Sequence, residues 1–358
     1  HGWAGFDGLT LQTPQLQAFQ NLSPARPILG DPNRPGYIIF TSGTSGQPRA
    51  VLHAHRAVWA RRMMWTGWYE LTPQDVMMHA GAFNWTYTLG TGLMDPWAIG
   101  ASAVIPNTQE PAELWQIMQA EEASIFAAAP GIYRRLLQQS FVQPPRLRHG
   151  LSAGDVLPRS VRQRWQDRTQ TPICEAFGMT ECSTFLSATP SAPEHLAVQP
   201  GRKIAIFDGA DLAERGQIGT ISVDGRDPGL MLGYIEAAAI NLPLKNGWYH
   251  TADQGQMYAD GRIGFAGRSG DILNAGGYRV APREIEQVLE ACPGVQEVGV
   301  TEVEVRPDVF VIAAFVVGED PCDLAQIDAL AARHLARYKQ PRIVQKVPAL
   351  PRNANGKL

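Results

Sequence analysis

The chain has 358 residues, of which 44% are hydrophobic and 18% are charged, so it is long enough for more than one folded domain. Its formal net charge of −3 comes with no basic stripe, which disfavours nucleic-acid binding. The four cysteines form no CxxC pair, and no apolar run reaches the roughly 18 residues that span a bilayer. We therefore expect buried thiols, no membrane span and a cytoplasmic location.

The first two thirds of the chain predict strands and helices in alternation. Tyr37–Phe40 is predicted as a strand that leads into a Gly/Ser/Thr loop and then a helix from about Val51. Further short strands are predicted at Ala101–Ile105, Ser124–Ala128, Arg148–Ser152 and Ile173–Phe177. Helices that open with proline, which suits a first helical turn, are predicted at Pro111–Ala120, Pro130–Gln138 and Pro158–Asp167. This alternation predicts a layered α/β domain.

After about Gly201 the pattern changes to short strands joined by Gly/Asp turns. These strands are predicted at Ile204–Phe207, Ile218–Val223, Gln256–Ala259 and Ile263–Ala266. A compact α+β unit follows, with helices at Pro282–Ala291 and Asp323–Arg337 and strands at Val295–Glu304, Val309–Val317 and Arg342–Val347. We expect a large α/β domain over residues 1–270 and a small α+β domain over residues 271–358, joined by a hinge.

The segment after the first strand has the composition of a phosphate-binding loop. It runs through Thr41, Ser42, Gly43, Thr44, Ser45 and Gly46 to Arg49. Glycines let the backbone approach an anion, and successive N–H groups and hydroxyls can then surround phosphate oxygens. The segment is not a Walker A loop, because GxxxxGK[ST] is absent. A flexible Gly/Ser turn is the alternative.

A second motif directly follows the strand at Ile173. It consists of Glu175, Ala176, Phe177, Gly178, Met179, Thr180 and Glu181. Loops at the carboxyl ends of strands bind ligands in open α/β sheets. Here an aromatic ring could stack on a base, Thr180 could bind a phosphate and Glu181 could hold Mg²⁺ through oxygen. A glycine turn followed by helix capping would look similar.

Two further motifs lie towards the end of the chain. Asp253 closes the run Gly247–Asp253, and its carboxylate could accept both hydroxyls of a ribose, with Arg268 following. Ordinary β-turn chemistry is the alternative. Lys357 lies in the terminal segment, where a point charge could stabilise a transferring phosphoryl group. A solvated tail is the alternative there.

Taken in this order, the four motifs resemble those of the superfamily of acyl- and aryl-CoA ligases, luciferases and peptide-synthetase adenylation domains. The resemblance covers the chain from about Gly36 to its end. It implies that Thr41 to Arg49 hold pyrophosphate, that Ala153 and Gly154 lie beside the adenine and that Phe177 stacks on it. It further implies catalytic roles for Thr180, Glu181, Arg49 and Lys357, with Asp253 and Arg268 at the ribose. Asp271 would be the hinge, and Gly276, Gly277 and Arg279 would line a coenzyme A channel.

The resemblance implies two half-reactions that use ATP, Mg²⁺ and coenzyme A. A carboxylic acid attacks the α-phosphate, and after the small domain rotates, the CoA thiol attacks the acyl-AMP. The chain departs from the pattern in having Arg49 for lysine and Phe177 for tyrosine. Only 36 residues precede Tyr37, where the family carries a much longer region. We therefore expect an N-terminal segment to be missing or supplied separately.

The acyl pocket is expected at Phe83, Asn84 and Trp85, with Gly178 and Met179. Asn84 has no charge to pair with an ammonium group, so an amino acid is disfavoured and an aryl or medium-length acyl group is favoured. Four other predictions concern the structure alone. Trp97 is expected in the core, and His53 and His55 on different sides of a helix; the Arg61–Arg62 and Arg134–Arg135 pairs are expected to be solvated.

Two other functions are left open. One is a stand-alone adenylation domain that loads a carrier protein, and the other is a nucleotide-binding fragment without catalysis. The acid and the oligomeric state, for which a homodimer is one option, do not follow from the sequence.

Overall fold

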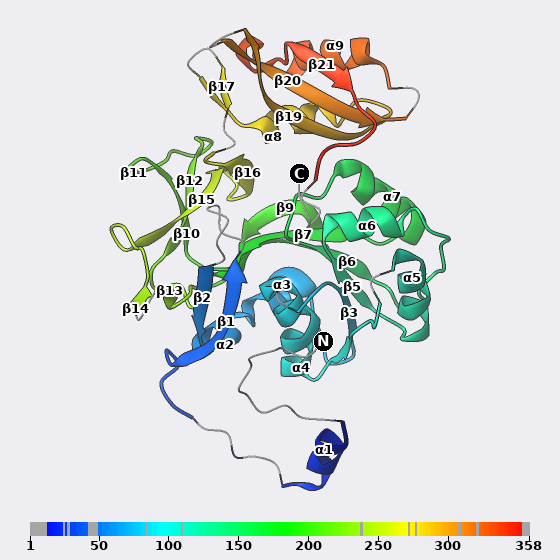
Figure 1. The fold of residues 1–358 in the computed structure, drawn as a ribbon, viewed down its shortest axis with the longest axis vertical. Helices are drawn as coiled ribbons and strands as arrows, with labels where there is room; N and C mark the ends of the chain where they lie inside the picture. The colour runs from blue at the N-terminus through cyan, green and yellow to red at the C-terminus, as the bar shows by residue number, and fades with distance from the viewer. Residues whose placement is uncertain are drawn as a thin grey trace.

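The computed structural model describes residues 13–23, 26, 29–41, 49–83, 85–108, 110–236, 239–270, 273–275, 278–306, 309–319 and 322–352. Figure 1 shows a large unit with a smaller unit at one end, and the short helix α1 (Thr13–Ala18) at the other. The short 3₁₀ turn Phe19–Asn21 follows α1. The mixed α/β class predicted from the sequence is confirmed.

The large unit is built on a seven-stranded sheet of order β4-β3-β5-β6-β7-β8-β9. The first five strands are parallel, and β8 and β9 are antiparallel. In chain order the strands are β3 (Val76–Ala80), β4 (Ser102–Val104), β5 (Ile125–Ala128), β6 (His149–Ser152), β7 (Ile173–Met179), β8 (Ser183–Thr189) and β9 (Ala192–Val198). Parallel strands need crossover connections, and those connections supply the helices on the two faces.

Aromatic side chains fill both faces of this sheet. On one face, helices α5 (Pro111–Ala120), α6 (Pro130–Leu136) and α7 (Arg159–Thr169) cover a core that includes the stacked rings of Trp115 and Trp165. The other face carries the helical segments Trp65–Tyr69, α3 (Thr86–Leu89), Gly90–Met94 and α4 (Asp95–Ile99). There Trp68 and Tyr69 are fully buried.

Two smaller sheets complete the large unit. One has the order β1-β2-β13-β14, and the other has the order β11-β10-β12-β15-β16. Their bounds are β1 (Pro35–Thr41), β2 (Arg49–Ala54), β10 (Ile204–Asp208), β11 (Asp211–Leu212), β12 (Gly219–Asp224), β13 (Gly233–Glu236), β14 (Ala239–Asn241), β15 (Trp248–Met257) and β16 (Ile263–Arg268). Both sheets contribute to one apolar cluster with β8, so β2 and β16 approach the end of β7.

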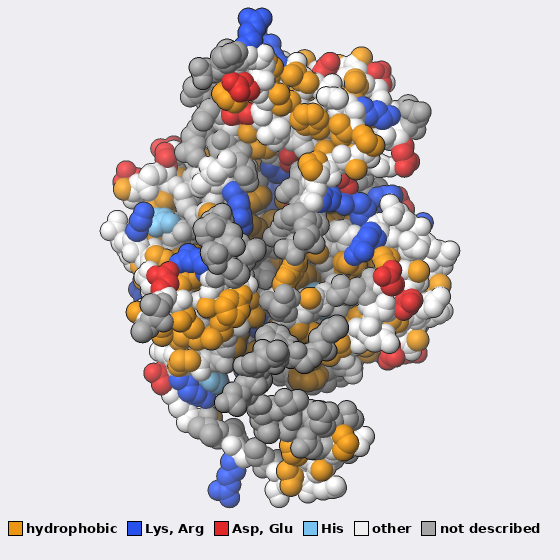
Figure 2. All heavy atoms as spheres, viewed as in Figure 1, with side chains coloured by type: hydrophobic (Ala, Val, Ile, Leu, Met, Phe, Trp, Pro, Cys, Tyr) orange, Lys and Arg blue, Asp and Glu red, His pale blue; other side chains and the backbone are white. Residues whose placement is uncertain are grey.

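The first of these sheets has an exposed apolar face. Ile39 of β1 and its register partner Val51 of β2 are buried on the core side of this sheet. On the opposite face Ile38, Phe40 and Ile240 are about half exposed or more. Figure 2 shows hydrophobic side chains gathered over this part of the molecule. An apolar patch of this kind marks a surface that commonly binds another polypeptide.

The C-terminal unit has its own core. The strands β19 (Val295–Arg306), β20 (Val309–Gly318) and β21 (Ile343–Lys346) form a sheet, and α8 (Pro282–Leu289) and α9 (Leu324–His334) pack on it. The short strands β17 (Leu273–Ala275) and β18 (Tyr278–Val280) lead into α8, and a 3₁₀ turn spans Arg337–Lys339. The boundary at residues 270 and 271 stays a prediction, and Asp271 lies outside the described residues.

Several predicted elements differ from the structure. The helix predicted from Val51 is wrong, because residues Arg49–Ala54 form β2 between β1 and β13, and helix α2 begins only at His55 and ends at Ala60. The strand predicted at Gln256–Ala259 is the end of β15, which starts at Trp248. The β8–β9 hairpin was not predicted. The distant strand β13 pairs with β2 and the start of β15 pairs with β12, whereas β8 and β9 form a local hairpin.

Candidate functional site

The carboxyl ends of the parallel strands bring Trp85 of the predicted acyl pocket close to Gly154, which is expected beside the adenine. The strands β4 and β5 lie on either side of β3, so the loops that leave β3 and β5 diverge, as they do at the binding crevice of open α/β sheets. Trp85 follows β3 and Gly154 follows β6. Gly154 has φ of +95°, and a Cβ added to it would lie 3.7 Å from the ring of Trp85. Phe83 is partly exposed beside them.

The turn that joins β7 to β8 carries Thr180 and Glu181 and is held through its backbone carbonyls. The ring Nε2 of His53 lies 2.8 Å from the Thr180 carbonyl oxygen, and the N–H of Met231 donates to the Glu181 carbonyl at 2.7 Å. The next carbonyl, of Cys182, accepts from the Arg202 guanidinium at 2.9 Å. Three distant segments therefore fix three successive peptide groups of the turn.

A buried ion pair and a close approach of β7 to β8 support these hydrogen bonds. Arg202 pairs with Asp227 at 2.9 Å, and both side chains are almost fully buried. Gly178 precedes the turn, and a Cβ there would lie 2.5 Å from the carbonyl oxygen of Ser183. Only glycine allows β7 and β8 to approach this closely. The geometry of the turn is thus set by packing and by buried hydrogen bonds.

The carboxylate of Glu181 is oriented by a pair of tyrosines. Tyr234 donates its hydroxyl to Glu181 Oε1 at 2.7 Å, and the hydroxyls of Tyr234 and Tyr249 lie 3.0 Å apart. Burial, together with the negative charge of Glu181, raises the pKa of Tyr234 to about 12. Tyr234 therefore stays protonated at neutral pH and remains a donor to the carboxylate.

His53 is a site residue that the sequence did not reveal. It lies on β2 rather than on a helix, with its ring stacked on Tyr37 at 4.7 Å. Burial lowers the pKa of His53 to about 4, so the ring is neutral at pH 7. Because a carbonyl oxygen only accepts, Nε2 carries the proton that reaches Thr180. An apolar strand with one histidine was the available signal, and the helix prediction hid it.

Phe177, Asp253 and Arg268 are expected to bind the nucleotide, and they lie on β7, β15 and β16. Phe177 packs edge-on against Phe185 at 5.5 Å and lies 5.1 Å from Phe265 of β16. Asp253 and Arg268 are register partners on β15 and β16, with Nε and Oδ1 3.6 Å apart. Asp253 is buried while Arg268 is exposed.

Glu175 and Arg49 have partners within the protein. Glu175 accepts from the N–H of Leu157 at 2.8 Å and pairs with Arg162; burial raises its pKa and Arg162 opposes that shift. It therefore ties β7 to the loop that contains the buried Ala153, and its neighbour Ala176 is also buried. Arg49 pairs with Glu236 at 2.7 Å and lies over the Tyr234 ring at 3.3 Å.

Several predicted residues cannot be placed with the others. Ser42, Gly43, Thr44, Ser45, Gly46, Asn84, Gly276, Gly277 and Lys357 lie outside the described residues, and of Arg279 only the backbone in β18 is described. Thr41 is described as the last residue of β1 and pairs with Arg49. Met179 packs against the same apolar cluster as Phe177.

Comparison with known families decides the identity of the fold. A family model described as AMP-binding enzyme matches residues 6–235, and the model of its C-terminal domain matches residues 284–357. The chain belongs to the AMP-binding enzyme family.

Curated relatives of the chain are named as acyl-coenzyme A synthetases and CoA ligases. A human (Homo sapiens) mitochondrial acyl-coenzyme A synthetase is 30% identical over 345 residues, which are 89% of this chain and 58% of the relative. A 3-hydroxybenzoate/4-hydroxybenzoate CoA ligase of Thauera aromatica is 29% identical, over 91% of this chain and 65% of the relative. The chain thus spans about three fifths of the length of these curated relatives.

Solved structures of AMP-binding enzymes have the same fold. MatB from Rhodopseudomonas palustris, solved with ATP bound, superposes with a TM-score of 0.81 at 26% identity, over 96% of this chain and 70% of that chain. The anthranilate CoA ligase AuaEII, in complex with anthranoyl-AMP, gives a TM-score of 0.79 at 25% identity, over 91% of this chain and 66% of that one.

Three expectations about solvent exposure are wrong. Arg61 is not solvated, because its guanidinium pairs with Asp95 at 2.7 Å and both side chains are buried. Tyr69 also donates to Asp95, at 2.9 Å, so the charge pair is satisfied inside the core. Trp97 is 64% exposed, because α4 buries Asp95 and Pro96 and turns the indole outward. Arg134 is also largely shielded, since it pairs with Glu297.

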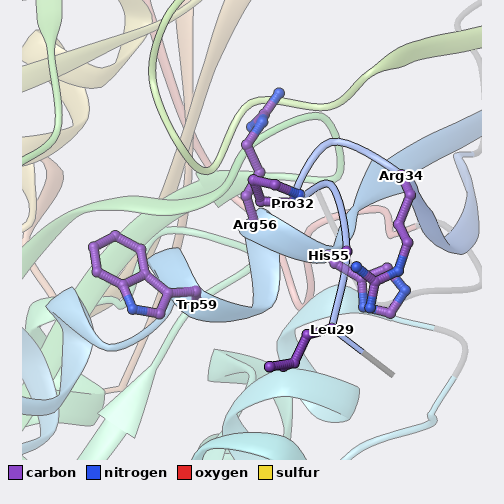
Figure 3. A pocket seen from close by; sticks show the side chains of 7 residues that line it. Leu29, Pro32, Arg34, His55, Arg56 and Trp59 are labelled. Carbon is purple, nitrogen blue, oxygen red and sulfur yellow. The ribbon is translucent and has the colours of Figure 1, made fainter. Parts of the chain in front are cut away.

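A surface hollow of about 340 Å³ lies beside helix α2. Figure 3 shows Trp59 on one side of it and Arg34 and His55 on the other. Arg56 donates to the carbonyls of Pro228 and Leu230, so its charge is committed to the fold. None of the residues that line this hollow belongs to the predicted site.

Within the described residues, no three His, Cys, Asp or Glu side chains are grouped so as to hold a metal ion. In the same part of the chain, no helix has the length and apolarity that a membrane span needs.

Proposed function

We propose that the chain carries the ATP-dependent activation of a carboxylic acid to acyl-AMP and then forms the thioester with coenzyme A. The observation that carries this proposal is the anchored Thr180–Glu181 turn beside the Asp253–Arg268 pair. One end of this arrangement offers a hydroxyl and a carboxylate for phosphates, and the other offers a carboxylate for ribose hydroxyls. The names of the CoA ligase relatives support the same chemistry.

The chemistry of Glu181 fits a magnesium ion. Mg²⁺ is commonly held through one or two carboxylates together with substrate phosphates, rather than by a complete protein cage. Glu181 offers a half-buried carboxylate that Tyr234 orients through Oε1. Mg²⁺ held there would offset negative charge on the phosphates of ATP. In the proposed reaction, Thr180 binds the α-phosphate, and Arg49 and Lys357 supply positive charge around the leaving pyrophosphate.

The pocket residues support an uncharged acyl group of aryl or medium-chain size. Trp85 and Gly154 face each other at the carboxyl edge, and Phe83 lies near them in the same loop as Trp85. The indole of Trp85 packs close to Gly154 and forms an apolar aromatic wall, which suits an aromatic ring or a short alkyl chain. The anthranoyl-AMP bound by one structural relative agrees with this size class.

Three further assignments concern the acceptor, the compartment and the completion of the large domain. Coenzyme A is proposed as the acceptor in place of a carrier protein because the relatives named above are CoA ligases. A cytoplasmic location is proposed because Cys174, Cys182 and Cys292 are free thiols that the fold buries. Completion of the large domain by a further N-terminal segment is also proposed. The apolar outer face formed by Ile38, Phe40 and Ile240 supports it.

Pyrophosphate release tests the proposal. Purified protein is incubated with ATP and Mg²⁺ and a panel of benzoates, fatty acids and amino acids, with and without coenzyme A. We expect release that depends on an aryl or medium-chain acid and rises with coenzyme A. Detectable ATP binding without release for any acid would contradict catalysis and favour a nucleotide-binding fragment. Release that rises with a carrier protein but not with coenzyme A would move the acceptor to that protein.

A further inference from the structure

One carboxylate of the C-terminal unit joins the large unit to the chain that leads to Lys357. Glu297, near the start of β19, pairs through Oε1 with Nε of Arg134 on α6 at 2.5 Å. Its second oxygen, Oε2, accepts from the Arg352 guanidinium at 2.9 Å. The two arginines come from different units, so a single carboxylate bridges them.

Further contacts keep this junction in place. Ser160 at the start of α7 donates its hydroxyl to the carbonyl oxygen of Gln296, next to Glu297, at 2.8 Å. The side chain of Glu297 is only 14% exposed, and those of the two arginines are 20% and 24% exposed. Charges at this depth are screened less by salt than a fully exposed pair. Ser160 therefore holds the main chain beside Glu297, while the two arginines hold the Glu297 side chain.

The junction lies at the edge of the site. Helix α6 begins directly after β5, and α7 begins after the loop that contains Gly154, so their first turns lie at the carboxyl edge of the sheet. Figure 1 shows the last segment of the chain descending from the small unit towards α6 and the central sheet. This segment is packed as far as Arg352, since Val347 donates to Val316 and Leu350 is buried.

Lys357 follows Arg352 by five residues. Five residues of extended chain reach at most roughly 18 Å, so the position of Arg352 limits where the lysine can act. We propose that Glu297 is a positioning residue: by holding Arg352 against Arg134, it keeps the small unit docked on α6 in the arrangement that acyl-AMP formation uses. This inference rests on the proposed function. It further implies that the contact must open when the small unit rotates for the thioester step.

The test separates the two half-reactions. In Glu297→Gln the shape is kept and the charge is removed. We expect acyl-AMP formation to fall about tenfold, the size of one charge-assisted hydrogen bond lost in that step. Thioester formation from supplied acyl-AMP and coenzyme A should stay unchanged or rise. Asp328→Asn, an exposed carboxylate on α9 of the same unit, is the matched control and should change neither rate.

Arg352→Gln and the double variant sharpen the test. If the two residues act as one unit, Glu297→Gln combined with Arg352→Gln should lose no more activity than either single variant. Equal loss of both half-reactions, no loss in either, or fully additive losses would overturn the inference.

A second readout does not need activity. Arg352 is a tryptic cleavage site whose side chain Glu297 holds. We expect trypsin to cut after Arg352 faster in Glu297→Gln than in the unsubstituted protein or in Asp328→Asn, as followed by mass spectrometry. Unchanged cleavage would overturn the inference. Faster cleavage in a protein that forms no acyl-AMP with any acid would instead show that the anchor exists and that the proposed function fails.

Discussion

The Thr180–Glu181 turn and the Glu297 junction are held in opposite ways. At the turn, His53, the backbone N–H of Met231 and Arg202 bind backbone carbonyls, and both His53 and Arg202 are buried. At the junction, a carboxylate and two arginines meet through side-chain atoms that water partly reaches. A buried hydrogen bond to a carbonyl is costly to break, whereas a partly exposed ion pair is exchanged for water cheaply.

The difference separates a permanent part of the site from a detachable part. In the proposed reaction the turn would keep its geometry in both half-reactions, because the same acyl-AMP would be made and then used there. The junction needs to form and break in each catalytic cycle if the small unit rotates. Weak, partly exposed contacts suit that task, and deeply buried ones suit the turn.

The largest expected effect is on stability, from breaking the buried pair behind the turn. Arg202→Met leaves Asp227 buried without its partner and should lower the free energy of unfolding by about 3–5 kcal/mol. Arg352→Met at the junction should cost about 1 kcal/mol or less, because that pair is partly exposed. Urea unfolding of both variants makes the comparison. Equal losses would remove the distinction between the two regions.

Lys357→Ala tests the proposed role of the small unit in acyl-AMP formation. Loss of one charge that stabilises the transition state should slow acyl-AMP formation by about 10²–10³-fold. Thioester formation from supplied acyl-AMP should be nearly unchanged, because the proposed reaction uses the lysine only in the first step. Lys346→Ala, an exposed lysine on β21, serves as the control. The role fails if Lys357→Ala slows both half-reactions to the same extent.

Acidification should destabilise the large unit, which contains the Thr180–Glu181 turn, before the C-terminal unit. Burial lowers the pKa of His53 to about 4 and those of His79 and His149 to about 3, from an ordinary value of 6.5. Between pH 6.5 and 4 the unfolded chain therefore binds more protons than the folded one. Stability from these histidines is complete above pH 6.5 and is lost as pH falls, by up to about 1.4 kcal/mol per pH unit for each.

His53→Phe tests this pH dependence. It should flatten the slope of unfolding free energy against pH by one proton, measured by urea unfolding between pH 4.5 and 6.5. All three histidines lie in the large unit, so the C-terminal unit should keep its structure further into this range. An unchanged slope in the variant would show that His53 is not neutral in the folded protein.

The smallest effect is expected at the carboxylate of the turn. Tyr234→Phe removes the hydroxyl that donates to Glu181 and should raise the Mg²⁺ concentration needed for half-maximal pyrophosphate release roughly fivefold, or about 1 kcal/mol. Tyr249→Phe leaves the Tyr234–Glu181 contact in place and should have less effect. A larger effect from Tyr249→Phe would show that Glu181 is oriented through a different route.

The sequence predicted local structure correctly where residues adjacent in the sequence determine it. Pro111, Pro130 and Pro282 each begin a helix, because proline fits a first turn whatever lies elsewhere. Gly/Asp turns were predicted between the strands after Gly201, and Gly261 adopts a positive φ in the turn between β15 and β16.

The predictions are wrong where residues distant in the sequence determine the structure. Val51 is in a strand because β13, far along the chain, pairs with β2. Arg61 is buried because Asp95 meets it across the core. His53 and Tyr234 belong to the site only because the fold brings β2 and β13 beside the end of β7. A single sequence gives the motif residues but not the residues that hold them.

The most direct test of acyl-AMP chemistry at the Thr180–Glu181 turn uses ATP labelled at the α-phosphate. The protein is given an accepted acid and Mg²⁺ first without coenzyme A and then with it, and the labelled products are separated. We predict labelled acyl-AMP in the first case and its conversion to labelled AMP in the second. Labelled ADP in place of both would mean that the acid attacks the γ-phosphate, and it would contradict adenylate formation at this site.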